Sequence, residues 1–377
     1  MRSPTAYVRG VRHPEAFHGH GVTRGYFEGW YNKVVSADRA QRWAVIPGVF
    51  RGLGGDSATG ASTDEAFVQV LDGRTGRSWY HRYEVGEFAA SDREFDVRVG
   101  PNRFSSAGMS LDLPQLRGEI AYTTPLEPWP VTVREPGIMG WYGLVPAMEC
   151  FHGIVSFGHG LAGEIDVEGD PTSFDGGRGY LEKDWGRAFP AGYVWMASNH
   201  LDTTDGDGAD ASLIASIAII PWLGRAFRGS IIGLRHGGRL HRWTTYNRSK
   251  ETRLSIDDTH VRWSVTGPDG VLELDAERVR GGLLHAPLRT AMHRRVEETL
   301  DASIVFRHLD HDGRVLLAGV GACAGLEVFG DTERLLALGR RRAASARPFA
   351  TTPARGIRPL RAPPRGHPDA SQAAGLG

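Results

Sequence analysis

Residues 179–186, Gly-Tyr-Leu-Glu-Lys-Asp-Trp-Gly, predict a β-strand that carries two acidic groups on one side. Successive side chains of a strand point to opposite faces, so Tyr180, Glu182 and Asp184 share a face. If that face lines the inside of a barrel, burial and mutual repulsion raise the pKa of one carboxyl, which then stays protonated near neutral pH. The commoner use of such a pair is structural, with Arg or Lys partners that hold a barrel together. Spacing alone leaves both interpretations open.

Two neighbouring segments have the same aromatic and acidic character. Residues 25–33, Gly-Tyr-Phe-Glu-Gly-Trp-Tyr-Asn-Lys, predict a strand with Glu28 and Trp30 on one face and Tyr31 on the other. Residues 193–200, Tyr-Val-Trp-Met-Ala-Ser-Asn-His, follow the first segment closely. The three segments contain most of the polar groups that lie among aromatic side chains, so we expect them to contribute the site residues.

Short β-prone runs joined by glycine-containing turns extend along most of the chain. The sequence has 50 Gly, 10 Trp, 10 Tyr and 15 Phe. Residues 66–71 end at Asp72-Gly73, and a second run resumes at residue 77, which is typical of a hairpin. Similar turns recur at residues 236–239, 268–270 and 312–313. Regular strands without alternating helices favour barrels or sandwiches over a parallel α/β sheet.

Helical patterns are few. Apolar residues four apart predict a helix over residues 288–300, at Leu288, Met292, Val296 and Leu300. Residues 331–338 predict a short helix behind an Asp or Thr cap. We therefore expect a mainly β fold with few short helices.

The length and the distribution of charge divide the chain into four parts. We expect residues 1–16 to form an N-terminal extension. The β pattern that follows covers about 320 residues, which is more than one small barrel contains. We expect one β-domain over residues 17–169 and a second over 170–338, with the boundary at the turn-rich Gly169-Asp170-Pro171. Residues 339–377 contain eight Arg and one Asp among Pro and Ala, which predicts a disordered basic tail.

Charge and missing motifs exclude several classes of protein. The 44 Lys and Arg balance 44 Asp and Glu, so nucleic acid is not an expected partner. Cys150 and Cys323 can form at most one disulfide, which excludes a disulfide-stapled secreted scaffold. Signatures of phosphate loops, zinc peptidases and α/β-hydrolases are missing. Residues 1–17 lack the apolar core expected of a signal peptide, and the most apolar run, residues 213–220, is too short to span a bilayer. A cytoplasmic protein, at most peripheral to a membrane, is expected.

The chain resembles the tocopherol cyclase-like family. The matching segments occur in order from about residue 17 to about residue 330, at residues 26–31, 44–48, 67–70, 136–142, 148–153, 174–186, 195–200 and 324–328. The resemblance implies two tandem lipocalin-like β-barrel domains, related to those of carotenoid 1,2-hydratases. It also implies an isomerase that cyclises a prenylated hydroquinone to a chromanol without a metal or other cofactor.

Such a reaction needs a strong acid, aromatic walls around a tertiary cation and a cavity that excludes water. As acids we predict Asp184 and Glu182 first and Glu28 next, with His152 orienting the phenol. Substrate-binding residues are predicted from the aromatic and polar members of the three segments: Trp30, Tyr31, Tyr180, Trp185, Tyr193, Trp195, Asn199 and His200.

Two other functions follow from the same physical requirements. If water reaches the cation first, the enzyme is a hydratase of an isoprenoid or carotenoid-type alkene. A two-barrel β-protein is equally suited to binding a lipophilic small molecule without catalysis. For each of the three functions the expected partner is a lipophilic small molecule. No obligate protein partner is expected, and a transient contact with a membrane surface stays open.

Overall fold

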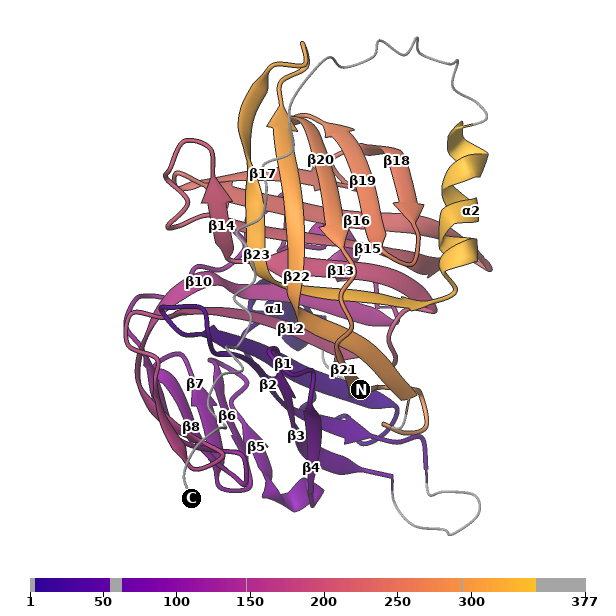
Figure 1. Cartoon of the computed structure of the whole chain (residues 1–377). Coiled ribbons are helices and arrows are strands. Elements are labelled where there is room, and N and C mark those ends of the chain that lie inside the picture. The colour runs from indigo at the N-terminus through magenta and orange to yellow at the C-terminus, as the bar shows by residue number, and fades with distance from the viewer. Residues whose placement is uncertain (1–3, 55–62, 147, 293, 344–377) are drawn as a thin grey trace, which may run out of the picture.

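Two large antiparallel β-sheets follow one another along the chain and pack together (Figure 1). The computed structural model describes residues 4–54, 63–146, 148–292 and 294–343 of the 377. In Figure 1 the first sheet, coloured indigo to magenta, lies below the second, coloured pink to orange. The predicted fold class, mainly β with two consecutive barrel-like units and few short helices, is confirmed.

The first sheet contains 12 strands within the described residues, ordered β4-β3-β2-β1-β12-β10-β9-β8-β7-β6-β5, with β11 paired to β10. Their bounds are β1 Tyr26–Val35, β2 Arg42–Arg51, β3 Glu65–Asp72, β4 Ser78–Tyr83, β5 Phe88–Ala90, β6 Asp96–Val99, β7 Asn102–Ser105, β8 Gly108–Leu113, β9 Leu116–Tyr122, β10 Cys150–Val167, β11 Asp170–Ser173 and β12 Arg178–Gly186. Strand β12 pairs with both β1 and β10, so strands from the beginning and the middle of the chain lie side by side in this sheet.

The second sheet contains 11 strands within the same described residues, ordered β17-β16-β15-β13-β23-β22-β20-β19-β18, with β14 paired to β23 and β21 to β22. Their bounds are β13 Gly192–Ser198, β14 His200–Thr203, β15 Ser212–Trp222, β16 Arg225–His236, β17 Arg239–Thr244, β18 Lys250–Ile256, β19 His260–Gly267, β20 Gly270–Glu277, β21 Gly282–Ala286, β22 Arg294–Leu309 and β23 Val315–Gly330. Helix α1 spans Pro4–Arg12 and α2 spans Thr332–Ala343, and two short 3₁₀ turns, η1 and η2, span Val85–Glu87 and Gly140–Leu144.

Each sheet curls around its own apolar core. Strands such as β20 alternate buried and partly exposed residues, as expected when one face packs inward. In the first sheet, Val45 and Val70 of β2 and β3 join the same cluster as Val97, Phe104 and Leu111 of β6–β8. Strands far apart in the ladder therefore face each other, and their side chains fill the interior.

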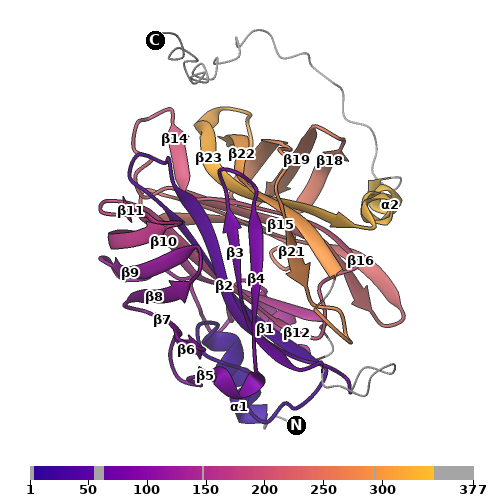
Figure 2. The same cartoon turned by 60° about the horizontal axis from the view of Figure 1, so that its bottom comes forward.

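A third apolar cluster lies between the sheets. Tyr31 and Ala44 of the first sheet share it with Trp195, Ile214 and Leu300 of the second. Strand β21 also packs against β3 and β4 of the first sheet, as Figure 2 shows, and β22 contacts β2. The second sheet therefore closes over the outer face of β1–β3 and β12.

Of two helices predicted from the sequence, one is wrong and one is confirmed, and most of the predicted tail cannot be compared with the structure. The helix predicted over residues 288–300 is wrong, because residues from Arg294 on belong to β22; side chains four apart lie on one face of a strand as well as of a helix. The helix predicted at residues 331–338 is confirmed as α2, which continues to Ala343 and so occupies the start of the predicted tail. The rest of that tail, from residue 344, lies outside the described residues.

The predicted domain boundary at Gly169 does not coincide with the change of sheet. Strands β11 and β12 follow that turn and still pair with β10. The chain passes to the second sheet between Gly186 and Gly192.

The two cysteines are free thiols. Among the described residues no helix is both long and apolar enough to cross a membrane.

Candidate active site

A cavity between the two sheets is lined by four acidic side chains, Glu182, Asp184, Glu298 and Glu327. It is lined by β1, β2, β3, β10 and β12 of the first sheet and by β13, β15, β16, β21, β22 and β23 of the second. Glu182 and Asp184 both line it, as expected for neighbours on one strand face. This face does not line the inside of a barrel, which was the condition set for a raised pKa, because the interior of each sheet is filled by its own core; it lines the space between the sheets instead.

The walls of the cavity are largely apolar and aromatic. The large lining side chains are Phe27, Tyr31, Phe67, Phe189, Tyr193, Trp195, Ile231, Leu284 and Met292. Neither Lys nor Arg occurs among the lining residues in the described part of the chain. A charged carboxylate here is therefore poorly solvated and has few cationic partners, which favours its protonated form.

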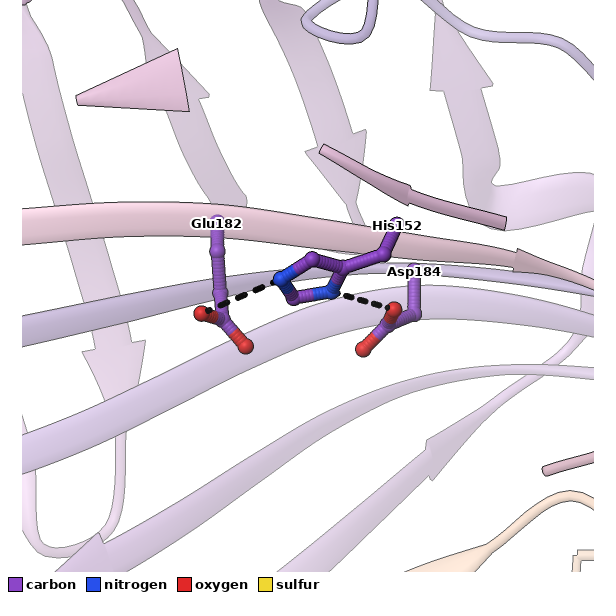
Figure 3. A group of neighbouring side chains, drawn as sticks. All are labelled: His152, Glu182 and Asp184. Atoms are coloured by element: carbon purple, nitrogen blue, oxygen red, sulfur yellow. Dashed lines mark hydrogen bonds and ion pairs between the residues drawn. The ribbon is translucent and has the colours of Figure 1, made fainter. Parts of the chain in front are cut away.

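His152 of β10 bridges the two carboxyl groups of β12 (Figure 3). Antiparallel pairing sets His152 directly opposite Asp184, and His152 Nδ1 lies 2.8 Å from Asp184 Oδ1. Its Nε2 lies 3.8 Å from Glu182 Oε2. Burial opposes a charge on this imidazole, but Asp184 and Glu182 outweigh it and raise the pKa of His152 to about 9. His152 is therefore an imidazolium at neutral pH, ion-paired with Asp184.

The same three residues have the composition of a metal site. Their ligand atoms all lie within 4.8 Å of one another. An imidazolium has no free lone pair on its nitrogens, so a divalent cation has to displace the proton of His152 before it can bind there.

Glu182 is the most deeply buried acid of this cluster, with 5% of its side chain exposed. Its Oε2 accepts hydrogen bonds from the Tyr180 hydroxyl and, at 3.2 Å, from Trp195 Nε1. Burial raises the pKa of Glu182 to about 7, although His152 and these hydrogen bonds act in the opposite direction. Because Oε2 is already an acceptor twice over, Oε1 is the oxygen available to hold the proton.

A second pair of carboxyl groups lines the cavity, and the sequence analysis did not identify it. Glu298 of β22 and Glu327 of β23 stand directly opposite each other. Glu327 lies within residues 324–328, one of the segments that carry the family resemblance, and this was the available signal. Glu298 lies in the stretch for which the apolar spacing predicts a helix, so the sequence pattern does not place it on a strand face.

Tyrosine side chains hold this second pair. The Tyr31 hydroxyl donates to Glu298 Oε1, and the Tyr193 hydroxyl donates to Glu327 Oε2 at 2.6 Å. Burial raises the pKa of Glu298 well above its usual range, and the nearby Glu327 adds to the effect. Burial also raises the pKa of Glu327 to about 7. The pair therefore retains a proton at neutral pH.

The predicted site residues divide between the cavity and other places. Three of the predicted binding residues line the cavity together with His152: Tyr31, Tyr193 and Trp195. Tyr180 does not line it, but its hydroxyl donates a hydrogen bond to Glu182. Their predicted roles stay predictions, but the structure does bring these side chains together.

The hypothesis that Glu28 faces the substrate is wrong. Glu28 stands opposite Trp185 on β12, so it lies on the other side of the sheet from Glu182. It is fully buried, forms an ion pair with Lys183 and accepts the backbone N–H of His18 at 2.8 Å. Burial opposes its charge, but Lys183 and His18 lower the pKa of Glu28 to about 2. Glu28 is a structural carboxylate.

Five of the eight predicted binding residues lie outside the cavity: Tyr180, which reaches it only through Glu182, and Trp30, Trp185, Asn199 and His200. Trp30 is buried in the core of the first sheet, and Trp185 stacks on Phe151 in a separate cluster on the same side of that sheet. Asn199 and His200 line a different, polar pocket, and Asn199 Nδ2 donates to the Gly179 carbonyl at 2.8 Å. Burial lowers the pKa of His200 to about 2, so this imidazole is neutral.

Comparison with known proteins gives the family. The sequence profile described as "Tocopherol cyclase-like" matches residues 115–330. A probable chloroplastic tocopherol cyclase of Oryza sativa subsp. japonica is 24% identical over 292 residues, which are 65% of this chain and 61% of the rice protein. A chloroplastic tocopherol cyclase of Zea mays is 23% identical over 336 residues, 76% of this chain and 69% of the maize protein. The chain thus spans less than two thirds of the rice relative.

Solved structures give weaker likenesses. A putative AttH protein from Nitrosomonas europaea has a TM-score of 0.48 and 14% identity, covering 80% of this chain and 92% of its own. Kievitone hydratase from Nectria haematococca has a TM-score of 0.45 and 11% identity, covering 81% and 89%. The family match covers more than half of the sequence, and this chain belongs to the tocopherol cyclase-like family.

Proposed function

We propose that this protein is an isomerase that closes a prenylated hydroquinone to a chromanol by acid catalysis. The observation that carries the proposal is a buried carboxylic acid, Glu182, which has a pKa of about 7 and lines an apolar cavity between two sheets. Membership of the family and the names of the plant relatives support the same reaction. The substrate is then a lipophilic small molecule.

Protonation of the prenyl double bond is the difficult step, because it creates a tertiary cation. A carboxylic acid that stays protonated near neutral pH can deliver that proton. Tyr31, Tyr193 and Trp195 line the cavity in which the cation would form, and electron-rich rings stabilise a nearby positive charge. The cation is then captured by the phenol oxygen of the same molecule, which is held close by the walls.

Glu182 is a better candidate for the acid than Asp184. Asp184 is ion-paired with the His152 imidazolium at 2.8 Å, and an anion in such a pair has no proton to give. The positive charge of His152, whose Nε2 lies 3.8 Å from Glu182 Oε2, can stabilise the carboxylate that Glu182 becomes after it has given up its proton. We therefore assign Glu182 as the acid, with His152, held by Asp184, as the cation that stabilises its carboxylate form.

The direct test is incubation of the purified protein with a prenylated hydroquinone, followed by chromatography and mass spectrometry. Cyclisation gives a product of unchanged mass at a new chromatographic position. A gain of one water identifies a hydratase, and recovery of bound but unaltered ligand identifies a binding protein. Either of these two results would refute the cyclase proposal. For substitutions of Glu182, the matched control is Glu164→Gln, which changes an exposed carboxylate on β10 and should leave turnover unchanged.

A further inference from the structure

The second sheet supplies an acid pair of its own to the cavity. Glu298 and Glu327 occupy opposed positions on β22 and β23, and both line the cavity that also holds Glu182. Glu298 is fully buried, whereas Glu327 is partly exposed. Two carboxylates this close in a poorly solvated site cannot both ionise readily.

The hydrogen bonds of the pair leave room for one shared proton. Tyr31 and Tyr193 each donate to one carboxyl group, and the two carboxyl groups occupy opposed positions on paired strands, so a single proton held between them can bridge the pair. Glu298 Oε2 is buried and has no hydrogen-bond partner among the described residues. A structural pair would be expected to satisfy this oxygen, since an unpaired buried acceptor costs about 1–3 kcal/mol.

Tyr31 links the two acid centres across the boundary between the sheets. It stands directly opposite Glu182 on the neighbouring strand, and its hydroxyl reaches Glu298 of the other sheet. Its ring packs edge-on against Trp195, the residue that donates to Glu182. The ionisable groups near the pair come from five other strands: Tyr31, Lys33, His152, Glu182, Asp184, Tyr193 and His285.

We propose that the Glu298–Glu327 pair is a second catalytic centre, which holds one proton, carries one negative charge and accepts the phenol proton as the ring closes. This inference rests on the proposed cyclisation and adds the base that the reaction requires. In the aspartic proteases, a carboxyl pair that shares one proton likewise serves as an acid and base.

The step balances without any further reactant. The Glu182 carboxyl gives its proton to one alkene carbon, so the π bond breaks and a C–H bond forms. The phenol oxygen forms the C–O bond to the cationic carbon, and its O–H bond breaks. That proton passes to the Glu298–Glu327 pair, which then holds two protons while Glu182 is a carboxylate. After the product leaves, the pair loses one proton to solvent and Glu182 regains one.

The test compares Glu298→Gln, Glu327→Gln and the double variant with the wild type, by measuring kcat and KM across pH. The matched control is Glu297→Gln, which changes the adjacent, exposed residue of β22. Each variant of the pair should lower kcat at least about 100-fold, the contribution typical of a general base, with little change in KM. The wild type should lose activity at low pH, where the pair takes up its second proton, and the double variant should lack this acidic limb.

Wild-type kcat in the double variant, or a reduced kcat with the acidic limb intact, would overturn the proposal. An inactive wild type would instead overturn the proposed function, and the pair can then be tested separately by infrared spectroscopy. A protonated carboxyl band at pH 7 that persists in Glu182→Gln and Glu297→Gln, but disappears in Glu298→Gln and Glu327→Gln, supports the shared proton. A spectrum without such a band contradicts it.

Discussion

At the scale of single residues, the site depends on which face of the sheet each carboxyl occupies. Strand parity in the sequence correctly places Glu182 and Asp184 on one face, and both line the cavity. The sequence could not relate that face to the face of Glu28, because their relation depends on the register between β1 and β12. Two acids in equally distinctive segments therefore end in opposite environments, one protonated and one ion-paired.

We expect Glu182→Gln to abolish turnover while making the protein more stable at alkaline pH. Burial raises the folded-state pKa of Glu182 to about 7, above its ordinary value of 4.5, so the folded state binds this proton more tightly than the unfolded state. That stabilising effect is complete below pH 4.5 and is lost as the pH rises through 7. Glutamine stays neutral, so the variant should gain on the order of 2 kcal/mol over the wild type between pH 5 and pH 8. Urea unfolding at the two pH values measures this, and an equal difference at both would contradict it.

The Glu28–Lys183 ion pair should behave in the opposite way. Both side chains are fully buried, so Lys183→Met leaves the buried Glu28 carboxylate without its lysine partner and should cost about 3–5 kcal/mol of unfolding free energy. In the wild type the pKa of Glu28 lies at about 2, below its ordinary 4.5. Its stabilising effect is therefore present above pH 4.5 and is lost as the pH falls toward 2.

Chemical denaturation of Lys183→Met, with turnover measured per folded molecule, checks this structural role. The control is Arg103→Gln, which breaks an exposed pair with Asp96 and should change stability by less than about 0.5 kcal/mol. A loss of less than about 1 kcal/mol of unfolding free energy in Lys183→Met would show that the buried ion pair contributes little to holding β1 against β12.

At the scale of strands, close backbone approach positions the aromatic wall. A Cβ added to Gly325 of β23 would lie 2.6 Å from the Trp195 ring and 3.5 Å from the Tyr31 hydroxyl. The ring has to move, and its bond to Glu182 has to weaken. We expect Gly325→Ala to cost about 1–3 kcal/mol and to reduce kcat, as measured by thermal unfolding and the cyclisation assay.

Gly29 is the matched comparison, because it also lines the cavity. A Cβ there meets no atom closer than 3.7 Å, so alanine fits without strain and only fills space. Gly29→Ala should keep wild-type stability and raise KM. Equal stability of the two variants would mean that the Trp195 ring is not fixed by Gly325.

The strands themselves were largely predictable from the sequence, whereas their partners were not. Hairpins such as β3–β4, joined through Asp72-Gly73, follow from local turn chemistry. The pairing of β1 with β12 joins segments about 150 residues apart, and no local pattern encodes it. Glu298 was missed for a different reason: a spacing of four fits a helix and a strand alike, and the pairing of β22 with β23 decides between them.

At the scale of the whole molecule, the site exists only because the two sheets pack together. Gln69 of β3 exchanges two hydrogen bonds with the backbone of His285 on β21, at 2.7 and 3.0 Å. Lys33 of β1 donates to the Cys323 carbonyl of β23 at 2.9 Å. These buried polar contacts fix one sheet against the other, so the proton donor and the proposed base come from different halves of the chain.

Substrate binding should therefore slow amide exchange in both sheets at once. Glu182→Gln, which cannot turn over, can be loaded with the prenylated hydroquinone and followed by hydrogen exchange and mass spectrometry. We expect protection in β12 of the first sheet and in β13 and β23 of the second, because ligand contacts suppress local opening of the strands that hold it. Strands β7 and β8 do not line the cavity and provide the internal control. Protection confined to one sheet would mean that the ligand binds elsewhere, and that the cavity shared by Glu182 and Glu327 is not the site.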